Sequence, residues 1–400
     1  MRGLFFLALL SLLFTGCSDE ESGATETSTT SGSESPTAFD ISTVLNIDLD
    51  ALLNYNNQYI PAYITKDNTP GNNTITNEGA TLGRVLFYDK KLSVDNTIAC
   101  ASCHKQELAF GDNDSQSNGV DGVTGRHSMR LINSRFADEN QFFWDERASS
   151  LEQQTTMPIQ DHIEMGFSGE NGDLGFDDLI NKLEDEEYYA PLFTLVYGTP
   201  DITEAKMQNA LAQFIRSIQS FDSKYDNGRL LVNNDGQAFP NFTQQENDGK
   251  QLFLQPPTFD NQGNRIAGGI GCAGCHRAPE FDIDPNSRNN GVIGIAGTTI
   301  GTDLTNTRSP SLRDVVQADG TSNGQFMHTG VSDDLTTVLN HYNAISLVGN
   351  NNLDPRLRPG GNAQQLNLTD TERNAVIAFL TTLAGTDVYT NEKWSDPFIE

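Results

Sequence analysis

The chain has 400 residues, with 25 Lys and Arg against 54 Asp and Glu, which gives a formal net charge of -29. This length is enough for two or three domains, and so negative a charge argues against binding to nucleic acid or to anionic lipid head groups. The one long apolar run, 4–14, is about half the roughly 20 residues that a membrane-spanning helix needs, so we expect no segment to cross a bilayer.

The beginning of the chain is typical of an exported protein. The apolar run ends in Gly16-Cys17, which resembles a bacterial lipoprotein leader whose cysteine becomes the lipidated first residue. We expect 1–16 to be the signal peptide, Cys17 to carry the lipid, and 17–38, which has no large apolar residue, to form a flexible tether. The expected location is the cell envelope, facing the periplasm and anchored only through the lipid, with an outer-membrane lipoprotein as one form. An ordinary secretory signal with an incidental cysteine is the alternative.

The other four cysteines all lie in two strings of the form Cys-x-x-Cys-His. Cysteines at i and i+3 lie on one face of a helical turn, where they form thioethers to the two vinyl groups of a haem, and the histidine that follows binds the iron. We therefore predict two covalently bound haems c. Disulfides, zinc or a redox dithiol remain alternatives, but none of them requires a histidine after each pair. The predicted sites are Cys100, Cys103 and His104, and Cys272, Cys275 and His276.

A shorter repeat precedes each haem string. The pattern Gly-x-x-Leu-Phe occurs at Gly83–Phe87 and again at Gly249–Phe253. Two copies of the same pattern ahead of two haem strings indicate two related haem domains in tandem. We place an N-terminal domain over 39–235 and a C-terminal domain over 236–400.

Helix signals dominate outside the haem strings. Apolar residues at steps of three and four predict an amphipathic helix over 204–221, and Thr-x-x-Glu capping boxes start helices at Thr243 and Thr369. Gly385 is placed to end the last helix, and the Gly-, Asn- and Pro-rich stretch 225–242 is predicted to be the interdomain linker. The predicted fold class is mainly α, with two tandem cytochrome c-like haem domains and long loops.

Several longer strings, spread in order from about residue 80 to 385, identify a family. They are LGRVLFYDKKLSVDNTIACASCH, FFWDERASSLEQQTTMPIQDHIEMG, RSPSLRDV, FMHTGVSDDLTTVLNHYN and FLTTLAG. With them the chain resembles the bacterial di-haem cytochrome c peroxidases, a family that includes the enzymes that mature methylamine dehydrogenase. The resemblance implies that the N-terminal haem is the peroxide site and that the C-terminal haem receives electrons from a small cytochrome c or copper protein. It also implies a homodimer.

The resemblance assigns roles to three side chains of the second string. Glu164 matches the acid/base carboxylate that moves a proton between the peroxide oxygens. Gln154 matches a polar residue of the pocket above the iron, and Trp144 matches the relay between the haems. The alternatives are a solvated glutamate, a loop amide and a core tryptophan. Glu146 stands where the family usually has Gly.

The residue that binds the far side of the second iron distinguishes two branches of the family. The peroxidase branch uses Met and the maturation branch uses Tyr, whose anionic oxygen favours oxidised iron. Tyr342 matches the Tyr position. His341 and Met327, the only Met that follows His276, are the alternatives.

Two further positions depart from the family pattern. Relatives that block the resting peroxide haem do so with a His where this chain has Gly119, so the first haem is expected to be open without reductive activation. His127 replaces an Asn that in relatives helps to hold a calcium ion between the domains. Calcium is therefore doubtful, although the carbonyls of Asn323 and Gln325 could still serve it. Of the other histidines, His162 is expected in a loop, and His328 near the second haem in a structural role.

Three functions are compatible with these residues. The first is an oxidoreductase that reduces hydrogen peroxide to water with electrons from a small donor protein, which would carry a basic docking face. The second is a maturation-type enzyme whose high-valent haems oxidise a protein or organic substrate through Trp144. The third is a di-haem electron carrier without peroxide chemistry.

Overall fold

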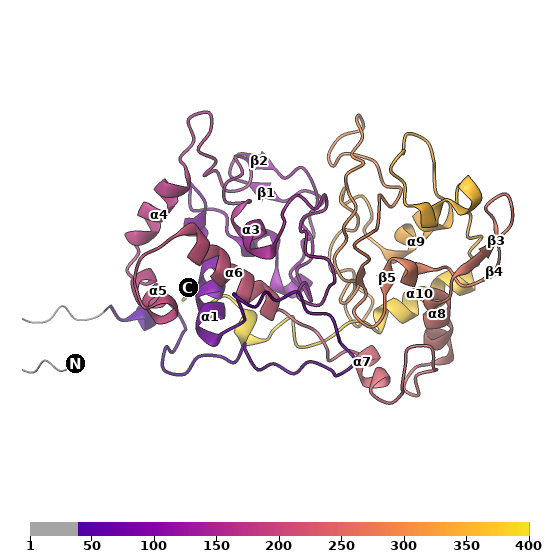
Figure 1. Cartoon of the computed structure of the whole chain (residues 1–400), viewed down its shortest axis with the longest axis horizontal. Helices are drawn as coiled ribbons and strands as arrows, with labels where there is room; N and C mark the ends of the chain where they lie inside the picture. Colours follow the sequence, from indigo (N-terminus) through magenta and orange to yellow (C-terminus); the bar gives the residue numbers. More distant parts are fainter. Residues whose placement is uncertain (1–38, 400) are drawn as a thin grey trace, which may run out of the picture. The chain divides into compact units, whose positions relative to one another are not determined.

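The computed structural model describes residues 39–399, and 39–400 form one unit by packing (Figure 1). The predicted signal peptide 1–16, the lipidation site Cys17 and the tether 17–38 lie outside the described residues. Within the described part of the chain, no helix combines the length and the apolar character that crossing a bilayer requires.

Helices dominate the described chain, which confirms the predicted mainly helical class. The α-helices are α1 (Asn77–Tyr88), α2 (Cys100–Cys103), α3 (Leu151–Thr156), α4 (Phe176–Glu184), α5 (Tyr189–Tyr197), α6 (Glu204–Ser217), α7 (Lys224–Arg229), α8 (Gln244–Leu254), α9 (Leu335–Asn343) and α10 (Asp370–Thr381). Short 3-10 turns are η1 (Ile41–Thr43), η2 (Lys90–Leu92), η3 (Gln106–Leu108), η4 (Cys272–Gly274), η5 (Pro355–Leu357), η6 (Pro359–Gly361) and η7 (Glu392–Trp394). The strands pair as small antiparallel hairpins, β1 (Asn118–Gly119) with β2 (Gly122–Val123), β3 (Pro257–Phe259) with β4 (Arg265–Gly268), and β5 (His276–Arg277) with β6 (Asp282–Ile283).

The first hydrophobic core forms where α1 crosses α6. A side chain at Gly83 would bring its Cβ to 2.0 Å from the carbonyl oxygen of Ala210, so only glycine allows the two helices to approach this closely. One turn further along α1, the ring of Phe87 packs on Phe214, with 5.1 Å between the centroids. The glycine and the phenylalanine of the repeated pattern therefore form the helix crossing.

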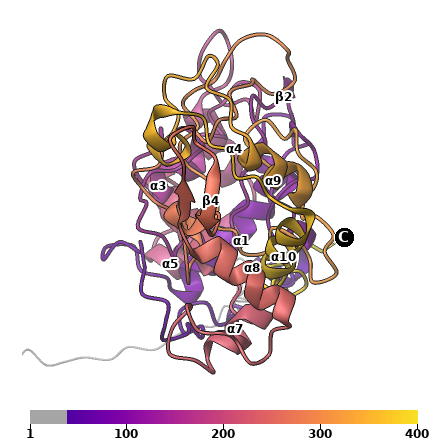
Figure 2. The same cartoon turned by 90° about the vertical axis from the view of Figure 1, so that its right-hand side faces the viewer.

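The second core repeats this crossing with α8 and α10, which lie side by side in Figure 2. A Cβ at Gly249 would come within 1.8 Å of the carbonyl oxygen of Ala375, and the rings of Phe253 and Phe379 are 5.3 Å apart. The same sequence pattern thus builds the same helix pair in both halves of the chain. Each pair brings its phenylalanine toward the neighbouring haem string.

The helices α8 and α10 begin at the predicted capping boxes, whereas α6 and α10 end before the predicted residues. The side chains of Thr243 and Thr369 accept hydrogen bonds from the backbone at the starts of α8 and α10, as predicted. The helix expected over 204–221 ends at Ser217, because the next residues turn away to bond with Asn133, whose side chain accepts the backbone N–H of Ser220 (2.9 Å).

Gly385 does not end α10. That helix stops at Thr381, and the backbone N–H of Gly385 instead donates to the carboxylate of Asp314 (2.7 Å). A Cβ at Gly385 would meet the Ser220 hydroxyl at 2.2 Å. The glycine therefore serves a close contact between distant segments rather than a helix end.

The predicted linker 225–242 contains part of the second core. It includes most of α7, and Tyr225 is fully buried against Phe281, with 5.0 Å between the ring centroids. Asp226 forms a buried ion pair with Arg313 (3.0 Å). A segment that carries such buried side chains is part of a packed domain, so the linker interpretation was wrong over α7.

The end of the chain returns to the first core. Val388 and Trp394 belong to the same hydrophobic cluster as α1 and α6. In Figure 1 the yellow segment that follows α10 runs back to the side of the first core. The domain boundary at 235 stays a prediction. The packing starts the second core at Tyr225 and returns the last residues to the first.

We expect Gly249→Ala to lower the free energy of unfolding by about 2 kcal/mol, because overpacking a helix crossing forces its two backbones apart. Gly71→Ala is the matched control, since a Cβ at Gly71 meets no atom within 4 Å. Denaturant unfolding of the haem-loaded protein, followed by far-ultraviolet circular dichroism, measures both. Equal midpoints for the two variants would show that the α8–α10 crossing does not depend on the glycine.

Candidate functional site

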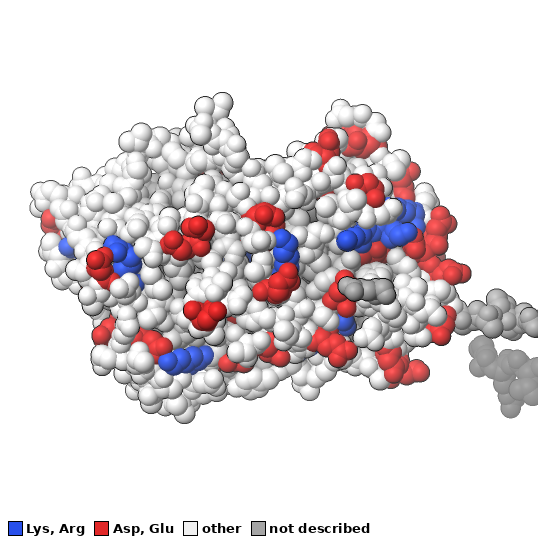
Figure 3. Space-filling view, turned by 180° about the vertical axis from the view of Figure 1, so that it is seen from behind, with Lys and Arg blue, Asp and Glu red and all other residues white. Residues whose placement is uncertain are grey.

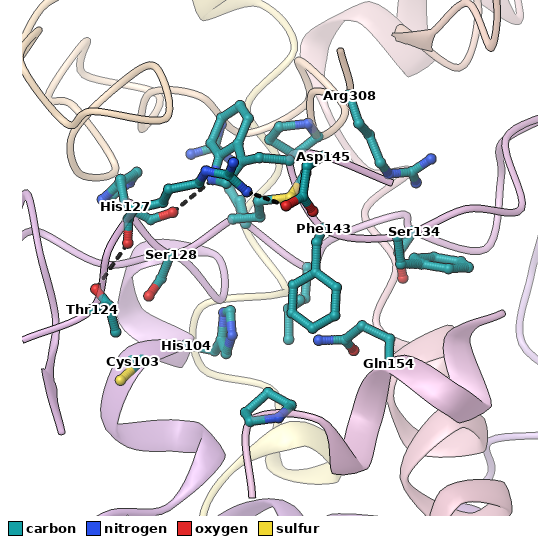
Figure 4. Close-up of a pocket in the computed structure, with 18 of the residues that line it drawn as sticks. Cys103, His104, Thr124, His127, Ser128, Ser134, Phe143, Asp145, Gln154 and Arg308 are labelled. Atoms are coloured by element: carbon teal, nitrogen blue, oxygen red, sulfur yellow. Dashed lines mark hydrogen bonds and ion pairs between the residues drawn. The ribbon is translucent and has the colours of Figure 1, made fainter. Parts of the chain in front are cut away.

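A cavity of about 740 Å³ lies at the first haem string. It contains all three side chains that the resemblance singled out in the second string. Figure 4 labels one of them, Gln154, together with His104. Its lining includes Cys100, Cys103, His104, Trp144, Gln154 and Glu164. The fold thus collects, in one space, residues that are up to 64 positions apart, from Cys100 to Glu164.

The imidazole of His104 is oriented for binding a metal. Its Nδ1 lies 3.3 Å from the carbonyl oxygen of Phe110, a residue with a left-handed backbone (φ 59°). Burial lowers the pKa of His104 to about 4, so the ring is neutral at physiological pH. The ring also has a backbone hydrogen bond with Met129, and a neutral imidazole that donates through one nitrogen can bind a metal through the other.

The cavity also fits the acidic groups of a haem. The Nε of Arg130, one Nη of Arg308 and the hydroxyl of Ser134 are buried without a hydrogen-bond partner, and all three residues line the cavity. Buried polar groups nearly always have partners, and guanidinium groups bind carboxylates well. A haem would bring two propionate carboxylates to these donors, so the residues fit this cofactor.

The four described cysteines are in a state that fits haem attachment. Cys100 and Cys103 are unpaired, as are Cys272 and Cys275, so the described cysteines form no disulfide. Residues 39–399 contain no cluster of three or more His, Cys, Asp or Glu that could hold a metal ion. Burial raises the pKa of the Cys100 thiol to about 12.

Glu164 has the electrostatics of an acid/base group. Burial, with a smaller contribution from Asp161, raises the pKa of its carboxyl to about 7, although Arg147 acts in the opposite direction. The loop is fixed by its own backbone, since the N–H of Glu164 donates to Asp161 (3.1 Å) and its carbonyl accepts from Val120 (3.2 Å). A carboxyl with this pKa both takes and returns a proton near neutral pH.

The hairpin β1–β2 packs on the Glu164 loop and explains the glycine at 119. A Cβ at Gly119 would lie 2.0 Å from the carbonyl oxygen of Ile163, so no side chain of any kind fits at this position. The exposed His162 binds Asp121 (2.9 Å) and Asp173 (2.7 Å) and is absent from the cavity lining. The position where some relatives carry a blocking histidine is therefore closed to any side chain here.

Gln154 and Phe143 project toward the same space as His104 (Figure 4). Gln154 lies on the short helix α3, which the hydroxyl of Ser150 caps at its start. The ring of Phe143 is covered on one face by the guanidinium of Arg147, 3.6 Å from its centroid. These side chains give the cavity one polar and one apolar wall beside His104.

Trp144 joins the two halves of the chain. Its indole N–H donates to the carbonyl of His127 (2.7 Å), and its ring lies 6.3 Å from that of His328. Its own carbonyl accepts the backbone N–H groups of Thr307 (3.0 Å) and Arg308 (3.1 Å). The indole is thus held by residues from both sides of the second haem string.

The tight turn after Trp144 explains the glycine that relatives have at position 146. Glu146 has φ 59°, in the left-handed region that glycine adopts without strain. Its carboxylate accepts a hydrogen bond from the hydroxyl of Thr307, and burial raises the pKa of this carboxyl. Glutamate is less favourable than glycine at this positive φ, but its side chain makes a contact between the two halves.

This turn occurs a second time in the C-terminal half. Phe142 bridges Ala148 and Phe326 bridges Ser332, and φ is positive at the second and fifth residues of both turns. Each turn leads into a capped helix, α3 or α9, after the same number of residues. Superposing the repeats by sequence places His328 at the position of Trp144, and Tyr342 at that of Pro158.

The second haem string repeats the local geometry of the first. Burial lowers the pKa of His276 to about 4, as it does for His104. His276 lies on β5, which is followed by Phe281 with φ 57°, matching the left-handed Phe110. The residues present fit a haem here as well, with Cys272 and Cys275 on the turn before β5.

The three candidates for the far side of the second iron all gather around Asn290. The amide nitrogen of Asn290 lies 3.3 Å from the hydroxyl of Tyr342 and 3.3 Å from the sulfur of Met327. The Nε2 of His341 lies 2.9 Å from the carbonyl oxygen of Asn290, so this nitrogen already has a partner. Burial raises the pKa of Tyr342, and a charge on Cys275 would raise it further, so the phenol lies near the haem string. Sequence reasoning missed Asn290, although Asn-Gly-Val follows both haem strings, at 118–120 and 290–292.

The residues at the expected calcium position do not fit calcium. The ring of His127 stands there, and its Nδ1 lies 2.9 Å from the carbonyl oxygen of Asp114. Calcium takes oxygen ligands, which an imidazole cannot supply. The backbone carbonyl of Gln325, one of the two that could have served calcium, is a hydrogen-bond partner of the His127 ring.

Comparisons with known proteins agree with this geometry. A family model described as di-haem cytochrome c peroxidase matches residues 77–233. The methylamine utilization protein MauG of Methylophilus methylotrophus is 29% identical over 327 residues, which are 79% of this chain and 85% of that protein. Cytochrome c peroxidase Ccp of Escherichia coli (strain K12) is 32% identical over 189 residues, which are 47% of this chain and 37% of that protein.

Solved structures share the fold. A MauG-like protein associated with microbial copper homeostasis has a TM-score of 0.64 at 25% identity, covering 85% of this chain and 99% of that one. The diheme peroxidase BthA from Burkholderia thailandensis E264 has a TM-score of 0.57 at 18% identity over 88% of this chain and 92% of that one, a likeness of fold alone. Relatives thus include both peroxidases and MauG proteins. Together with the two haem strings, these matches show that the chain belongs to the di-haem cytochrome c peroxidase family.

Proposed function

We propose that this protein is a peroxidase that reduces hydrogen peroxide to water with electrons from a small donor protein. The observation that carries the proposal is the carboxyl of Glu164, whose pKa is raised to about 7 in the same cavity as His104. Breaking the bond between the peroxide oxygens requires a group that removes a proton from one oxygen and delivers it to the other. Burial gives Glu164 a pKa close to the working pH for both steps.

The proposal includes one haem c in each of two tandem domains. Cys100, Cys103 and His104 would hold the first, and Cys272, Cys275 and His276 the second. When bound, the first haem supplies the iron that peroxide approaches, and the second supplies electrons. The unpartnered guanidinium groups of Arg130 and Arg308 would receive the propionates of the first haem.

The internal repeat supports an open position at the first iron. Where the second half carries Tyr342, the first half carries Pro158, whose side chain has no atom that can bind a metal. Pro158 lines the cavity with Gln154 and Glu164. The space above His104 is then left to peroxide, with Gln154 as a polar neighbour that orients it.

Trp144 suits the transfer of electrons between the two sites. Its indole N–H donates to the carbonyl of His127, and a backbone carbonyl does not accept a proton. An indole in this position keeps its proton when it loses an electron, so the electron returns without any proton having to move. Its contacts with both halves place the ring on the path between them.

The surface charge favours a basic electron donor. Acidic side chains lie across the face seen in Figure 3, with basic side chains in smaller groups between them, and the net charge is -29. We propose a small cytochrome c or copper protein with a basic docking face, whose encounter weakens as salt screens the charges. The proposed setting is the periplasmic side of the cell envelope, with the chain anchored through a lipid on Cys17 and able to pair as a homodimer.

A second candidate function rests on Tyr342. A phenolate on the second iron would favour its oxidised state, as in the maturation branch that the resemblance describes. The two sites would then hold oxidising equivalents and pass them through Trp144 to a protein or organic substrate. The Tyr342 hydroxyl, which lies beside Asn290 and near the second haem string, is the observation that favours this function.

The first test is the steady-state oxidation of a reduced small cytochrome c by hydrogen peroxide. We expect the oxidised holoprotein and the briefly pre-reduced holoprotein to turn over at similar rates, because Gly119 leaves no room for a blocking side chain. Turnover only after pre-reduction would contradict the open first site. No turnover in either form, with haem spectra that still respond to peroxide, would favour the second candidate function.

The role of Glu164 predicts a pH dependence. With a pKa of about 7, its carboxyl is protonated at pH 5 and ionised at pH 9, so the reaction of the first haem with peroxide should accelerate as the pH rises between these values. Glu164→Gln should remove this dependence and slow the reaction by roughly 100-fold or more, the usual contribution of an acid/base group. Stopped-flow absorbance of the haem measures both effects. The exposed Glu170→Gln is the matched control, and an equal loss in that variant would argue against a specific role for Glu164.

The proposed ligand of the second iron is tested by Tyr342→Phe. Loss of an anionic oxygen should raise the reduction potential of the second haem, which a spectroelectrochemical titration measures. The exposed Tyr59→Phe is the control, and its potentials should equal those of the unchanged protein. Unchanged potentials in Tyr342→Phe would exclude this tyrosine as the ligand. The neighbouring sulfur of Met327 is then tested by Met327→Leu.

A further inference from the structure

Two adjacent residues, Arg126 and His127, fasten the two halves of the chain beside Trp144. The guanidinium of Arg126 binds the carboxylate of Asp145 (2.6 Å) in the first half and that of Asp303 (2.7 Å) in the second. Hydrogen bonding to Asp145 and to Asp303 keeps the pKa of Arg126 raised despite its partial burial. One cation therefore ties the residue that follows Trp144 to the opposite half.

His127 makes four contacts from a buried position. Its backbone N–H donates to the carbonyl of His328 (2.8 Å), and its own carbonyl accepts the indole N–H of Trp144 (2.7 Å). Its ring Nδ1 lies 2.9 Å from the carbonyl oxygen of Asp114, and the carbonyl of Gln325 is a second hydrogen-bond partner of the ring. The side chain is only 6% exposed. The ring thus joins one carbonyl from each half, while the backbone holds the indole.

The two carbonyls come from loops that are pressed together. The N–H of Gln325 donates to the carbonyl of Asp112 (3.3 Å), and a Cβ at Gly324 would lie 1.9 Å from that same oxygen. Gly324 has φ 111°, which other residues rarely adopt. Carbonyl oxygens that converge in a buried space repel one another unless a donor or a cation lies between them. In this chain the group between them is the imidazole of His127.

We propose that the imidazole of His127 replaces a calcium ion as the link between the two halves, and thereby positions Trp144 without any metal. The residues fit no calcium at this place, and the ring supplies one N–H donor where the two carbonyls converge. His127 is a positioning residue, because it acts on electron transfer through the indole that its carbonyl holds. Arg126 supports the same contact from the neighbouring position.

The first test is made on the purified holoprotein without substitutions. We expect elemental analysis to find no stoichiometric calcium, and the melting temperature to be the same in excess chelator and in excess calcium. A protein isolated with one calcium per chain, or a lower melting temperature in chelator, would overturn the proposal. This part does not depend on the proposed function.

The second test compares His127→Ala with His127→Asn. Both variants should melt at a lower temperature than the unchanged protein. Added calcium should restore part of the loss in His127→Asn, because an amide oxygen joins the carbonyls as a hard ligand, and none in His127→Ala. The exposed His162→Asn is the matched control and should melt almost unchanged, with or without calcium. An identical response of both His127 variants to calcium would contradict the equivalence of ring and ion.

The positioning role is read from a kinetic split, and this part rests on the proposed function. In His127→Ala, oxidation of the second haem after peroxide is added should slow by at least about tenfold, since small displacements of a reacting group are costly. The direct reaction of the first haem with peroxide should keep its rate. A merely structural defect would slow both steps together and would overturn the positioning role. A lack of any peroxide reaction in the unchanged protein would contradict the proposed function and leave the calcium result standing.

Discussion

The hydrogen bond from the Trp144 indole to the carbonyl of His127 is the contact on which the arrangement of the two sites depends. The indole lines the first cavity, while its ring faces His328 from the second half. The neighbouring residues Arg126 and His127 fasten the two halves. Arg126 binds Asp145, and the carbonyl of His127 accepts the indole N–H of Trp144. The proposed electron transfer and the cohesion of the halves therefore depend on the same few atoms, so a substitution there should change both.

The internal repeat lets one folding unit produce two different iron sites. Both halves have the same close helix crossing, at Gly83 and at Gly249. Both also have a phenylalanine with a left-handed backbone after the haem string. Differences arise at single positions that the repeat superposes. Pro158, which has no atom that can bind a metal, lines the first cavity, and Tyr342 has the corresponding position in the second half. The two proposed sites therefore differ by single substitutions on a repeated frame, not by a difference in fold.

The sequence predicted the features that depend only on residues a few positions apart. The haem strings and the capping boxes at Thr243 and Thr369 act within a few residues, and the structure has both helix starts as predicted. Contacts between distant segments were beyond a reading of the sequence. Nothing near Tyr225 shows that its ring packs on Phe281, and nothing near Asn290 shows that it lies between Met327 and Tyr342. These positions are determined by tertiary packing, which overrides the local turn signals in the predicted linker.

The carboxyl of Glu164 shows how burial can raise the pKa of one side chain in a strongly acidic protein. A net charge of -29 would make any one glutamate unremarkable, yet burial raises the pKa of Glu164 to about 7 and Arg147 only partly offsets the shift. A carboxyl whose pKa is higher in the folded than in the unfolded state costs stability once the pH exceeds the unfolded value, by at most about 3 kcal/mol at high pH. Phe87 of α1 and Leu211 of α6, near the helix crossing at Gly83, line the same cavity as Glu164. The folding free energy of this packed core therefore has to offset the cost of keeping Glu164 buried at a pH where its carboxyl ionises.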